Sequence, residues 1–200
     1  MNGFKADAYR ALDALYTASN IEIDGKQVNV VQSLMDDERE LSLVQDPKGG
    51  DSHFKPSRNY RNWSKDNTRT SAYNDIGTIF FDNTKGIMFD DIVNPSNTDY
   101  FTNQLNTGKL NRTTQINSPT SILGHELIHA YNKMDDSHAF HSRKGFNPVM
   151  NAQYRFMNEE EKRATSLSTK ININLGENPR HSYQGLYVPT QGVLSNQLKK

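Results

Sequence analysis

Residues 125–129 of this 200-residue chain spell HELIH, an HExxH motif within an apolar stretch, residues 121–130. On an α-helix, positions i and i+4 lie on one face, so the imidazoles of His125 and His129 can both approach one metal ion. Glu126 lies about 100° further round such a helix, where it can act on a water molecule without binding the metal. The motif therefore predicts one catalytic zinc site, with two histidine ligands and Glu126 as general base.

The helix that carries the motif has clear sequence signals. Ser118 is a good N-cap residue, and Pro119 is favoured at the first helical position. Leu123, Leu127 and Tyr131 fall opposite the two histidines, which predicts a buried helix. Burying imidazoles and a carboxylate without partners is costly, so a metal ion is implied.

Composition narrows the class of protein. With 34% hydrophobic residues, the chain can form one compact domain spanning residues 1–200. The 23 basic and 23 acidic residues balance, which argues against nucleic acid or an anionic membrane as the main partner. The chain has no cysteine, so nitrogen and oxygen atoms must hold the zinc.

The sequence also bears on localisation. No segment approaches the length of about 18 apolar residues that a transmembrane helix needs. The N-terminus lacks the basic and then apolar pattern of a Sec signal peptide. If the protein is exported, we expect another secretion route.

Periodicity predicts several elements before the motif. Residues 5–18 have the spacing of an amphipathic helix, residues 21–30 fit two short strands around Asp24-Gly25, and residues 41–44 fit a strand. Residues 46–74 and 94–118 are polar and predict long loops. The first loop holds a basic cluster, which is either a solvated surface or part of a substrate-docking surface: Arg58, Arg61, Lys65 and Arg69.

Residues 76–81 and 87–89 predict two further strands joined by residues 82–86. One of them is a candidate for the strand that edges the active-site cleft and pairs with substrate backbone; an ordinary core hairpin is the alternative. The expected fold is an α+β, single-domain, gluzincin-like zincin. It would combine the HExxH helix, a second helix with a glutamate ligand, and a small antiparallel or mixed sheet at the cleft.

A catalytic zinc site needs a third protein ligand. Asp135 lies six residues after His129, with Asn132 placed for a turn between them. Residues 159–161 offer glutamates on a second helix instead, 30–32 residues after His129. His138 and His141 are also close in sequence, and we interpret them as exposed loop histidines.

Between the two glutamates, the sequence favours Glu161 over Glu160. Glu161 is followed at i+3 and i+4 by the small residues Ala164 and Thr165, which would let its helix approach the HExxH helix closely. Glu160 has the bulky Arg163 at i+3. We therefore expect Glu161 as the third ligand, with Glu160 and Asp135 as alternatives.

An RxxY sequence lies further along, at Arg180 and Tyr183. A guanidinium or a phenol near the metal can stabilise the negative charge that develops on a scissile carbonyl oxygen. The alternative is a salt-bridged arginine and a packed tyrosine.

The series HELIH, Glu-Glu-x-Arg-small-Thr at residues 160–165 and RxxY at residues 180–183 resembles the active site of clostridial neurotoxin light chains. In those zinc endopeptidases the second glutamate of the pair binds zinc, and the arginine and tyrosine assist the transition state. The resemblance implies Glu161 as ligand and Arg180 with Tyr183 as stabilisers. The light chains are about twice as long, and nothing outside the motifs matches.

Chain length and the run Asn178-Pro179-Arg180-x-x-Tyr183 resemble more closely the NleD-type effectors, M91-type zinc metalloproteases injected into host cells by type III secretion. The likeness covers residues 118–185 and departs from the family pattern at Ser166, where glycine is expected, and after Thr169. It implies a secreted virulence protein in the host cytoplasm that cleaves stress-activated MAP kinases in the activation loop. We expect a monomer.

Two other functions remain open from the residues alone. One is a zinc protease toxin with another protein target. The other is a non-catalytic binding protein in which zinc only staples the fold. Glu126 argues against a purely structural zinc ion, because a structural zinc site needs no base beside an open coordination position.

Overall fold

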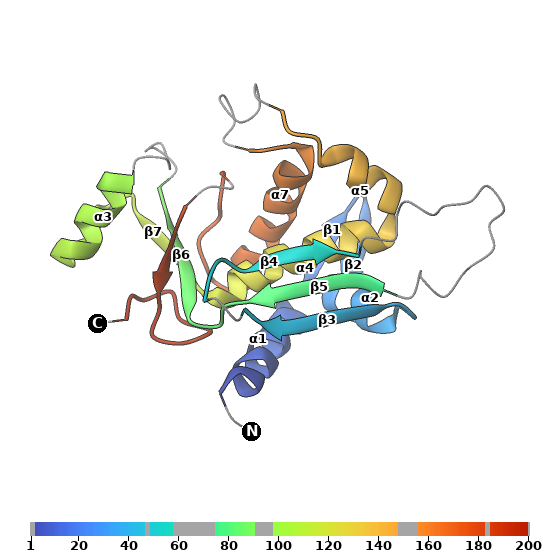
Figure 1. Ribbon diagram of the computed structural model, residues 1–200, viewed down its shortest axis with the longest axis horizontal. Coiled ribbons are helices and arrows are strands. Elements are labelled where there is room, and N and C mark those ends of the chain that lie inside the picture. Colours follow the sequence, from blue (N-terminus) through green and yellow to red (C-terminus); the bar gives the residue numbers. More distant parts are fainter. Residues whose placement is uncertain are drawn as a thin grey trace.

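The computed structural model describes residues 3–46, 49–57, 75–90, 98–147, 156–182 and 185–199, and confirms the expected α+β class (Figure 1). The helices in these ranges are α1 Phe4–Ala18, α2 Val30–Asp36, α3 Thr98–Thr107, α4 Pro119–Asp135, α5 Ser137–Arg143 and α7 Glu159–Asn174. The strands are β1 Asn20–Ile23, β2 Lys26–Asn29, β3 Glu40–Gln45, β4 His53–Pro56, β5 Asp75–Phe81, β6 Lys85–Phe89, β7 Gln115–Asn117 and β8 Leu186–Pro189.

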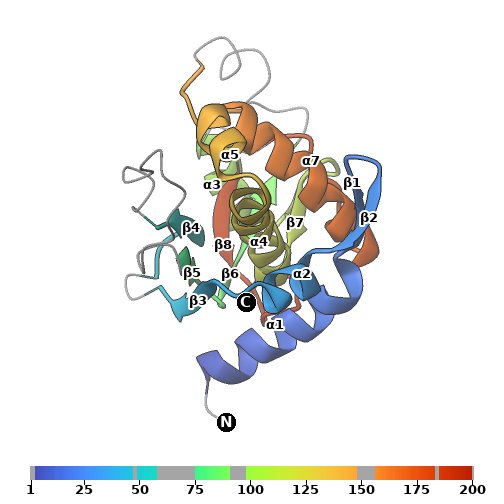
Figure 2. The same ribbon diagram turned by 90° about the vertical axis from the view of Figure 1, so that its right-hand side faces the viewer.

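Helix α4 carries the HExxH motif through the middle of the molecule. Its N-cap Ser118 accepts a hydrogen bond from the backbone N–H of Ser121, and Pro119 lies in the first turn, as predicted. All residues from 119 to 133 are buried. Figure 2 looks along α4 and shows β3, β4 and β5 on one side, α7 on the other, and α1 and α2 beneath it. Polar side chains on such a helix must find partners within the protein.

Gly124 lets α4 pack closely against α1 and α7. A Cβ atom at this position would lie 3.0 Å from Leu15 Cδ2 on α1 and 3.4 Å from Ile171 Cγ2 on α7. Leu15 and Ile171 are both fully buried, so neither has room to move aside. This close packing brings the side chains of α7 within reach of the histidines on α4.

The strands form three small sheets. β1 and β2 make an antiparallel hairpin, and the other two sheets have the orders β3–β5–β4 and β7–β6–β8. β3 runs parallel to β5, while β4 is antiparallel to it. In Figure 1, β4 lies on the side of its sheet that faces α4. The small mixed sheet at the HExxH helix is therefore present, with β4 as its nearer edge.

The predicted strands at residues 76–81 and 87–89 exist as β5 and β6, but each is the central strand of a different sheet. The expectation that one of them is an edge strand free to pair with substrate backbone is therefore wrong, although β6 lines the cleft with Lys85 and Ile87. The alternative of a hairpin is wrong too, because β5 and β6 do not pair with each other. Both strands are buried along most of their length, which is typical of strands with neighbours on both sides. The edge strand is β4.

The predicted loops contain regular structure. β4 interrupts residues 46–74, and α3 and β7 interrupt residues 94–118, so the loop prediction is wrong at these elements. β4 has four residues and one buried side chain, Phe54, so it carries almost no periodic signal. α3 is mostly polar and buries mainly Phe101 and Gln104. The basic cluster of residues 58–69 lies outside the described residues.

The N-terminal predictions agree better with the structure. α1 covers the predicted helix, and β3 contains the predicted strand at residues 41–44. Asp24 and Gly25 form the turn between β1 and β2, with φ angles of 49° and 79°. The second strand ends at Asn29, one residue before the predicted end, because the Asn29 side chain caps α2 and accepts a hydrogen bond from the Gln32 N–H at 2.9 Å.

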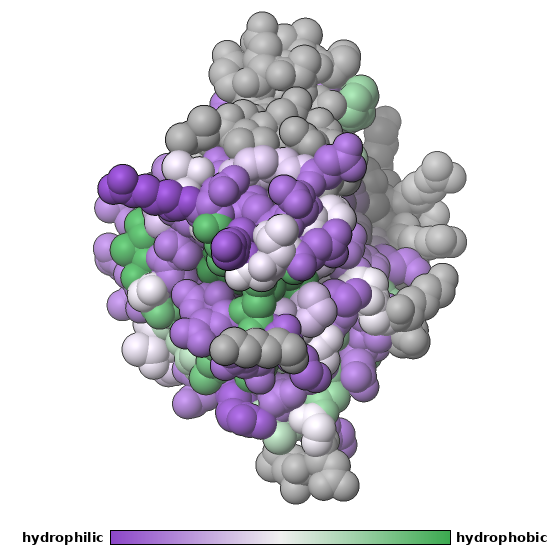
Figure 3. All heavy atoms as spheres, turned by 90° about the vertical axis from the view of Figure 1, so that its left-hand side faces the viewer, coloured by the Kyte–Doolittle hydropathy of each residue, from purple (hydrophilic) through white to green (hydrophobic). Residues whose placement is uncertain are grey.

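The surface at the end that carries α3 is mostly hydrophilic, and its hydrophobic side chains show in small patches (Figure 3). In the part of the chain that the structure describes, no helix combines the length and the apolar character that crossing a membrane requires.

Candidate metal centre

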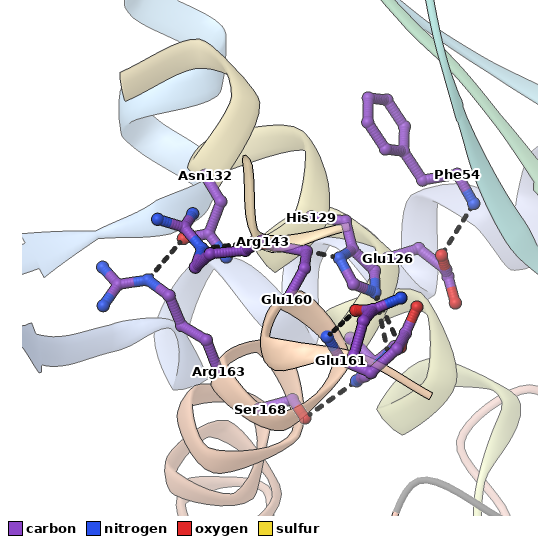
Figure 4. A network of polar contacts seen from close by, with 11 residues as sticks. Phe54, Glu126, His129, Asn132, Arg143, Glu160, Glu161, Arg163 and Ser168 are labelled. Atoms are coloured by element: carbon purple, nitrogen blue, oxygen red, sulfur yellow. Dashed lines mark hydrogen bonds and ion pairs between the residues drawn. The ribbon is translucent and has the colours of Figure 1, made fainter. Parts of the chain in front are cut away.

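Three potential metal ligands meet between α4 and α7 (Figure 4). His125 Nε2 and His129 Nε2 are 3.1 Å apart, and Glu161 Oε2 lies 3.4 Å and 3.2 Å from them. Zinc bonds of about 2.0–2.2 Å in a tetrahedral arrangement place ligand atoms about 3.3–3.6 Å apart. The three side chains therefore fit one zinc ion if they move apart by about 0.1–0.5 Å.

Hydrogen bonds on the far sides of the rings set the histidine tautomers. Ser168 Oγ donates to Thr165 O, so its oxygen is available to accept the Nδ1 proton of His125 at 3.3 Å. Glu160 Oε1 lies 3.2 Å from His129 Nδ1 and accepts there in the same way. Both Nε2 lone pairs then point toward one spot beside the Glu161 carboxylate. Lone pairs converging in this way call for a cation between them.

The electrostatics of the site favour a positive charge. Burial alone would lower the pKa of His129, but hydrogen bonds with Glu160 and Glu161 and the charge of Glu126 raise it to about 10. Burial would raise the pKa of Glu161, but hydrogen bonds with His125 and His129 hold it well below its usual range. Without a metal, the carboxylates would draw a proton onto the His129 imidazole. A metal cation would be stabilised by the same negative potential of the carboxylates.

The carboxylates grouped around the histidines also favour a cation. Glu126, Glu160 and Glu161 contribute three carboxylates, and Arg143, whose Nε donates to Glu160 at 2.7 Å, contributes one guanidinium. With neutral histidines, these residues carry two net negative charges. Nitrogen and carboxylate ligands suit zinc, as does the absence of cysteine from the sequence.

Glu126 lies next to the three ligands but does not join them. Its Oε2 accepts a hydrogen bond from the backbone N–H of Phe54 on β4 at 2.7 Å. Glu126 is 7% exposed and borders the open cleft. The carboxylate is thus held at the side of the metal site, with one oxygen engaged by the edge strand.

The cleft has a volume of about 810 Å³ and runs between the two larger sheets. β4 contributes His53 and Phe54 to one wall, and β8 contributes Leu186 and Tyr187 to another. The three potential ligands and Glu126 line the same cleft. A groove that contains the metal site between two edge strands can hold an extended peptide.

Arg180 lines this cleft, and its predicted role in stabilising charge stays a prediction. The backbone of Arg180 is anchored to α7, since Thr169 Oγ1 donates to Arg180 O at 2.7 Å and accepts from Arg180 N at 3.2 Å. The guanidinium lies 5.7 Å from the centre of the Phe89 ring. Tyr183 lies outside the described residues.

The structure places the other candidate ligands elsewhere. α4 continues without a turn through Asn132 to Asp135, which is exposed and outside the cluster. Asp135 as third ligand is therefore wrong. His138 and His141 lie outside the cluster too, on α5 rather than in a loop, with His138 exposed and His141 half-buried. Glu160 contacts His129 from the side opposite to Glu161.

Several residues of the site are not identified by the sequence alone. Phe54 acts through its backbone N–H, which leaves no sequence signal. Ser168 lies seven residues after Glu161 and so on the same helix face, a spacing that could have identified it. Arg143 precedes Lys144, a cleft residue, at the end of a short helix with no pattern that points to the metal site.

The HExxH helix, the glutamate on a second helix and the adjoining cleft define a metallopeptidase site. A family model named Peptidase_M91 and described as an effector protein matches residues 4–198. The chain therefore belongs to the Peptidase_M91 family of effector proteins, which confirms the resemblance to the NleD-type, M91-type effectors. No significant match exists among curated proteins or among solved structures.

Proposed function

We propose that this metallopeptidase is a zinc endopeptidase, in which His125, His129 and Glu161 bind one zinc ion and Glu126 is the general base. The observation that carries the proposal is the position of Glu126, beside the ligands and in the cleft but outside the ligand cluster. A purely structural zinc ion would need no carboxylate beside its ligands in an open cleft. The geometry thus favours the peptidase over the non-catalytic binding protein.

Zinc at this site would supply a Lewis acid for the peptide carbonyl and lower the pKa of a coordinated water molecule to about 7. Glu126 is placed to accept a proton from water in the cleft while the water oxygen bonds to the carbonyl carbon. When the C–N bond breaks, Glu126 returns this proton to the leaving amine. The Phe54 N–H engages one carboxylate oxygen, which leaves the other for the proton.

We assign Arg180 to stabilise the negative charge on the carbonyl oxygen, because it lines the cleft and its backbone is fixed to α7. The same role for Tyr183 rests on the sequence resemblance. If Tyr183 touches only that oxygen, Tyr183→Phe should lower kcat by about 10–1000-fold and leave KM nearly unchanged. A change confined to KM would place Tyr183 in substrate binding instead.

We further propose that the substrate lies extended along β4. The Phe54 N–H points away from β5, since it reaches Glu126. In an antiparallel ladder the N–H and C=O of one residue point to the same side, so the Phe54 carbonyl also faces the cleft. An extended peptide can donate a backbone N–H to this carbonyl and place its next peptide bond near the metal.

The target is a host protein, as befits an effector family. The resemblance to NleD-type effectors suggests a stress-activated MAP kinase, cut within its activation loop after type III delivery into the host cytoplasm. An activation loop is exposed and mobile and can be drawn into a cleft as a strand. If surfaces beyond the cut site also bind the kinase, a short activation-loop peptide should be cleaved much more slowly than the intact kinase.

The experiment that tests this function is incubation of host-cell lysate with the zinc-loaded protein, followed by mapping of new protein N-termini. Glu126→Gln is the matched control, because the amide can keep the Phe54 hydrogen bond without acting as a base. New N-termini in MAP kinases that depend on Glu126 support the full proposal. New N-termini in other proteins would leave a protease with another target, and none at all would contradict the proposed activity.

A further inference from the structure

Adjacent glutamates at the start of α7 have different surroundings, and the second of them, Glu161, has a proposed role as ligand. We propose that Glu160 is a positioning residue for the metal centre: it holds the His129 ring and its tautomer from the side opposite the metal. This inference rests on the proposed metal site and adds a second carboxylate to its machinery.

The contacts of Glu160 fully engage its carboxylate. Glu160 is 0% exposed. Oε1 accepts from Asn132 Nδ2 at 2.7 Å and lies 3.2 Å from His129 Nδ1, and Oε2 accepts from Arg143 Nε at 2.7 Å. A buried carboxylate is tolerated only with such complete pairing. Its neighbours come from α4 and α5, so the packing of three helices fixes its place (Figure 4).

The helix start explains why the two glutamates point in different directions. Asn158 caps α7 and accepts a hydrogen bond from the Glu161 N–H at 2.9 Å, so both glutamates lie in the first turn. Consecutive residues on a helix point about 100° apart. Glu161 therefore reaches the cleft, while Glu160 turns toward α4 and α5. The positive end of the helix dipole favours both carboxylates.

A chain of contacts extends from Glu160 to the protein surface. Asn132, its amide donor, accepts from Arg163 Nε at 3.3 Å, and Arg163 pairs with Asp24 of the β1–β2 turn at 2.7 Å. The Asn132 amide is thus oriented with its nitrogen toward Glu160. Glu160 therefore presents Oε1 to His129 in one fixed direction, which a carboxylate with only one partner would not do.

The two histidines are held unequally, which provides an internal control. His125 Nδ1 contacts the neutral hydroxyl of Ser168 at 3.3 Å, whereas His129 Nδ1 contacts a carboxylate. Hydrogen bonds to a charged acceptor are about twice as strong as neutral ones, and they raise the basicity of a ligand imidazole. Removing the charge of Glu160 should therefore weaken metal binding more than removing the hydroxyl of Ser168.

The test measures zinc affinity by competition with a chromophoric chelator, for wild type, Glu160→Gln, Ser168→Ala and Glu161→Gln. Glu160→Gln should still bind one zinc, with an affinity about 10–100-fold below wild type, and Ser168→Ala should lose roughly threefold or less. In the cobalt-substituted proteins, Glu160→Gln should shift the visible absorption bands, which a residue that only supports the fold would not do.

An affinity of Glu160→Gln within twofold of wild type, or no greater loss than Ser168→Ala, would overturn the proposal. So would a loss equal to that of Glu161→Gln, because Glu160 would then behave as a ligand. Failure of the wild-type protein to bind zinc would instead contradict the proposed function. If Glu160→Gln does not fold, Arg143→Leu is the alternative variant, because Arg143 is a partner of Glu160 and is more exposed. Arg143→Leu should lower zinc affinity by roughly threefold or more. Unchanged zinc affinity in Arg143→Leu would overturn the proposal.

Discussion

Replacing Glu126 by glutamine and by alanine should separate its catalytic role from its structural one. Both changes remove the base, so both should lower kcat by at least about 10²–10⁴-fold, the usual contribution of general acid–base catalysis. The two variants differ in the contact with β4. Glutamine can still accept the hydrogen bond that the Phe54 N–H makes with Glu126 at 2.7 Å, and alanine cannot.

The expected difference in stability follows from that contact. A peptide N–H that loses a buried acceptor costs about 1–3 kcal/mol, but water in the open cleft can replace part of the bond, so the lower half of this range applies. The higher helix propensity of alanine offsets a few tenths of a kcal/mol. We expect Glu126→Ala to be less stable than Glu126→Gln by about 1 kcal/mol, or about 2–4 °C in Tm for a chain of this size.

The assay compares the two variants in chemical and thermal unfolding with zinc bound, and in cleavage of a protein substrate. Because both variants lose the same charge, their difference isolates the hydrogen bond between Glu126 and β4. Equal stability would show that the edge strand does not hold Glu126 as described. Activity close to wild type in zinc-loaded Glu126→Gln would refute its role as general base.

Three further predictions concern packing, ionisation and the metal. Gly124→Val should destabilise the fold by about 1–3 kcal/mol in urea unfolding, because its side chain would collide with Leu15 and Ile171. Burial lowers the pKa of Lys133 from 10.5 to about 8, so the unfolded chain binds more protons between these pH values. Stability should rise with pH across this window by up to about 1.4 kcal/mol per unit, and Lys133→Met should remove that rise. A strong chelator should abolish cleavage and lower Tm, and re-addition of zinc should restore both.

The sequence predicts the parts of the site that depend on helix periodicity. The HExxH helix, its N-cap Ser118 and the choice of Glu161 follow from spacing along single helices, and the structure agrees with each. The small residues Ala164 and Thr165 are buried, as the argument for close helix packing required. Each of these features depends on residues a few positions apart in one helix, so it can be predicted from a single sequence.

Features that depend on distant parts of the chain escaped prediction. β4 is a strand because it pairs with β5, and its sequence of His, Phe, Lys and Pro has no strand pattern of its own. β5 and β6 were predicted as strands, but their place in two different sheets depends on pairing with distant segments. Glu160 and Arg143 have roles only because α5 packs beside α7, and no local spacing reports that contact.

Anomalous diffraction at the zinc absorption edge, from crystals of the purified protein, would show directly which residues bind the metal. We expect one anomalous peak between α4 and α7, bonded to His125 Nε2, His129 Nε2 and Glu161 at about 2.0–2.2 Å. A peak bonded to Glu160 instead of Glu161, or no metal at the two histidines in protein that cleaves its substrate, would contradict the proposed metal site.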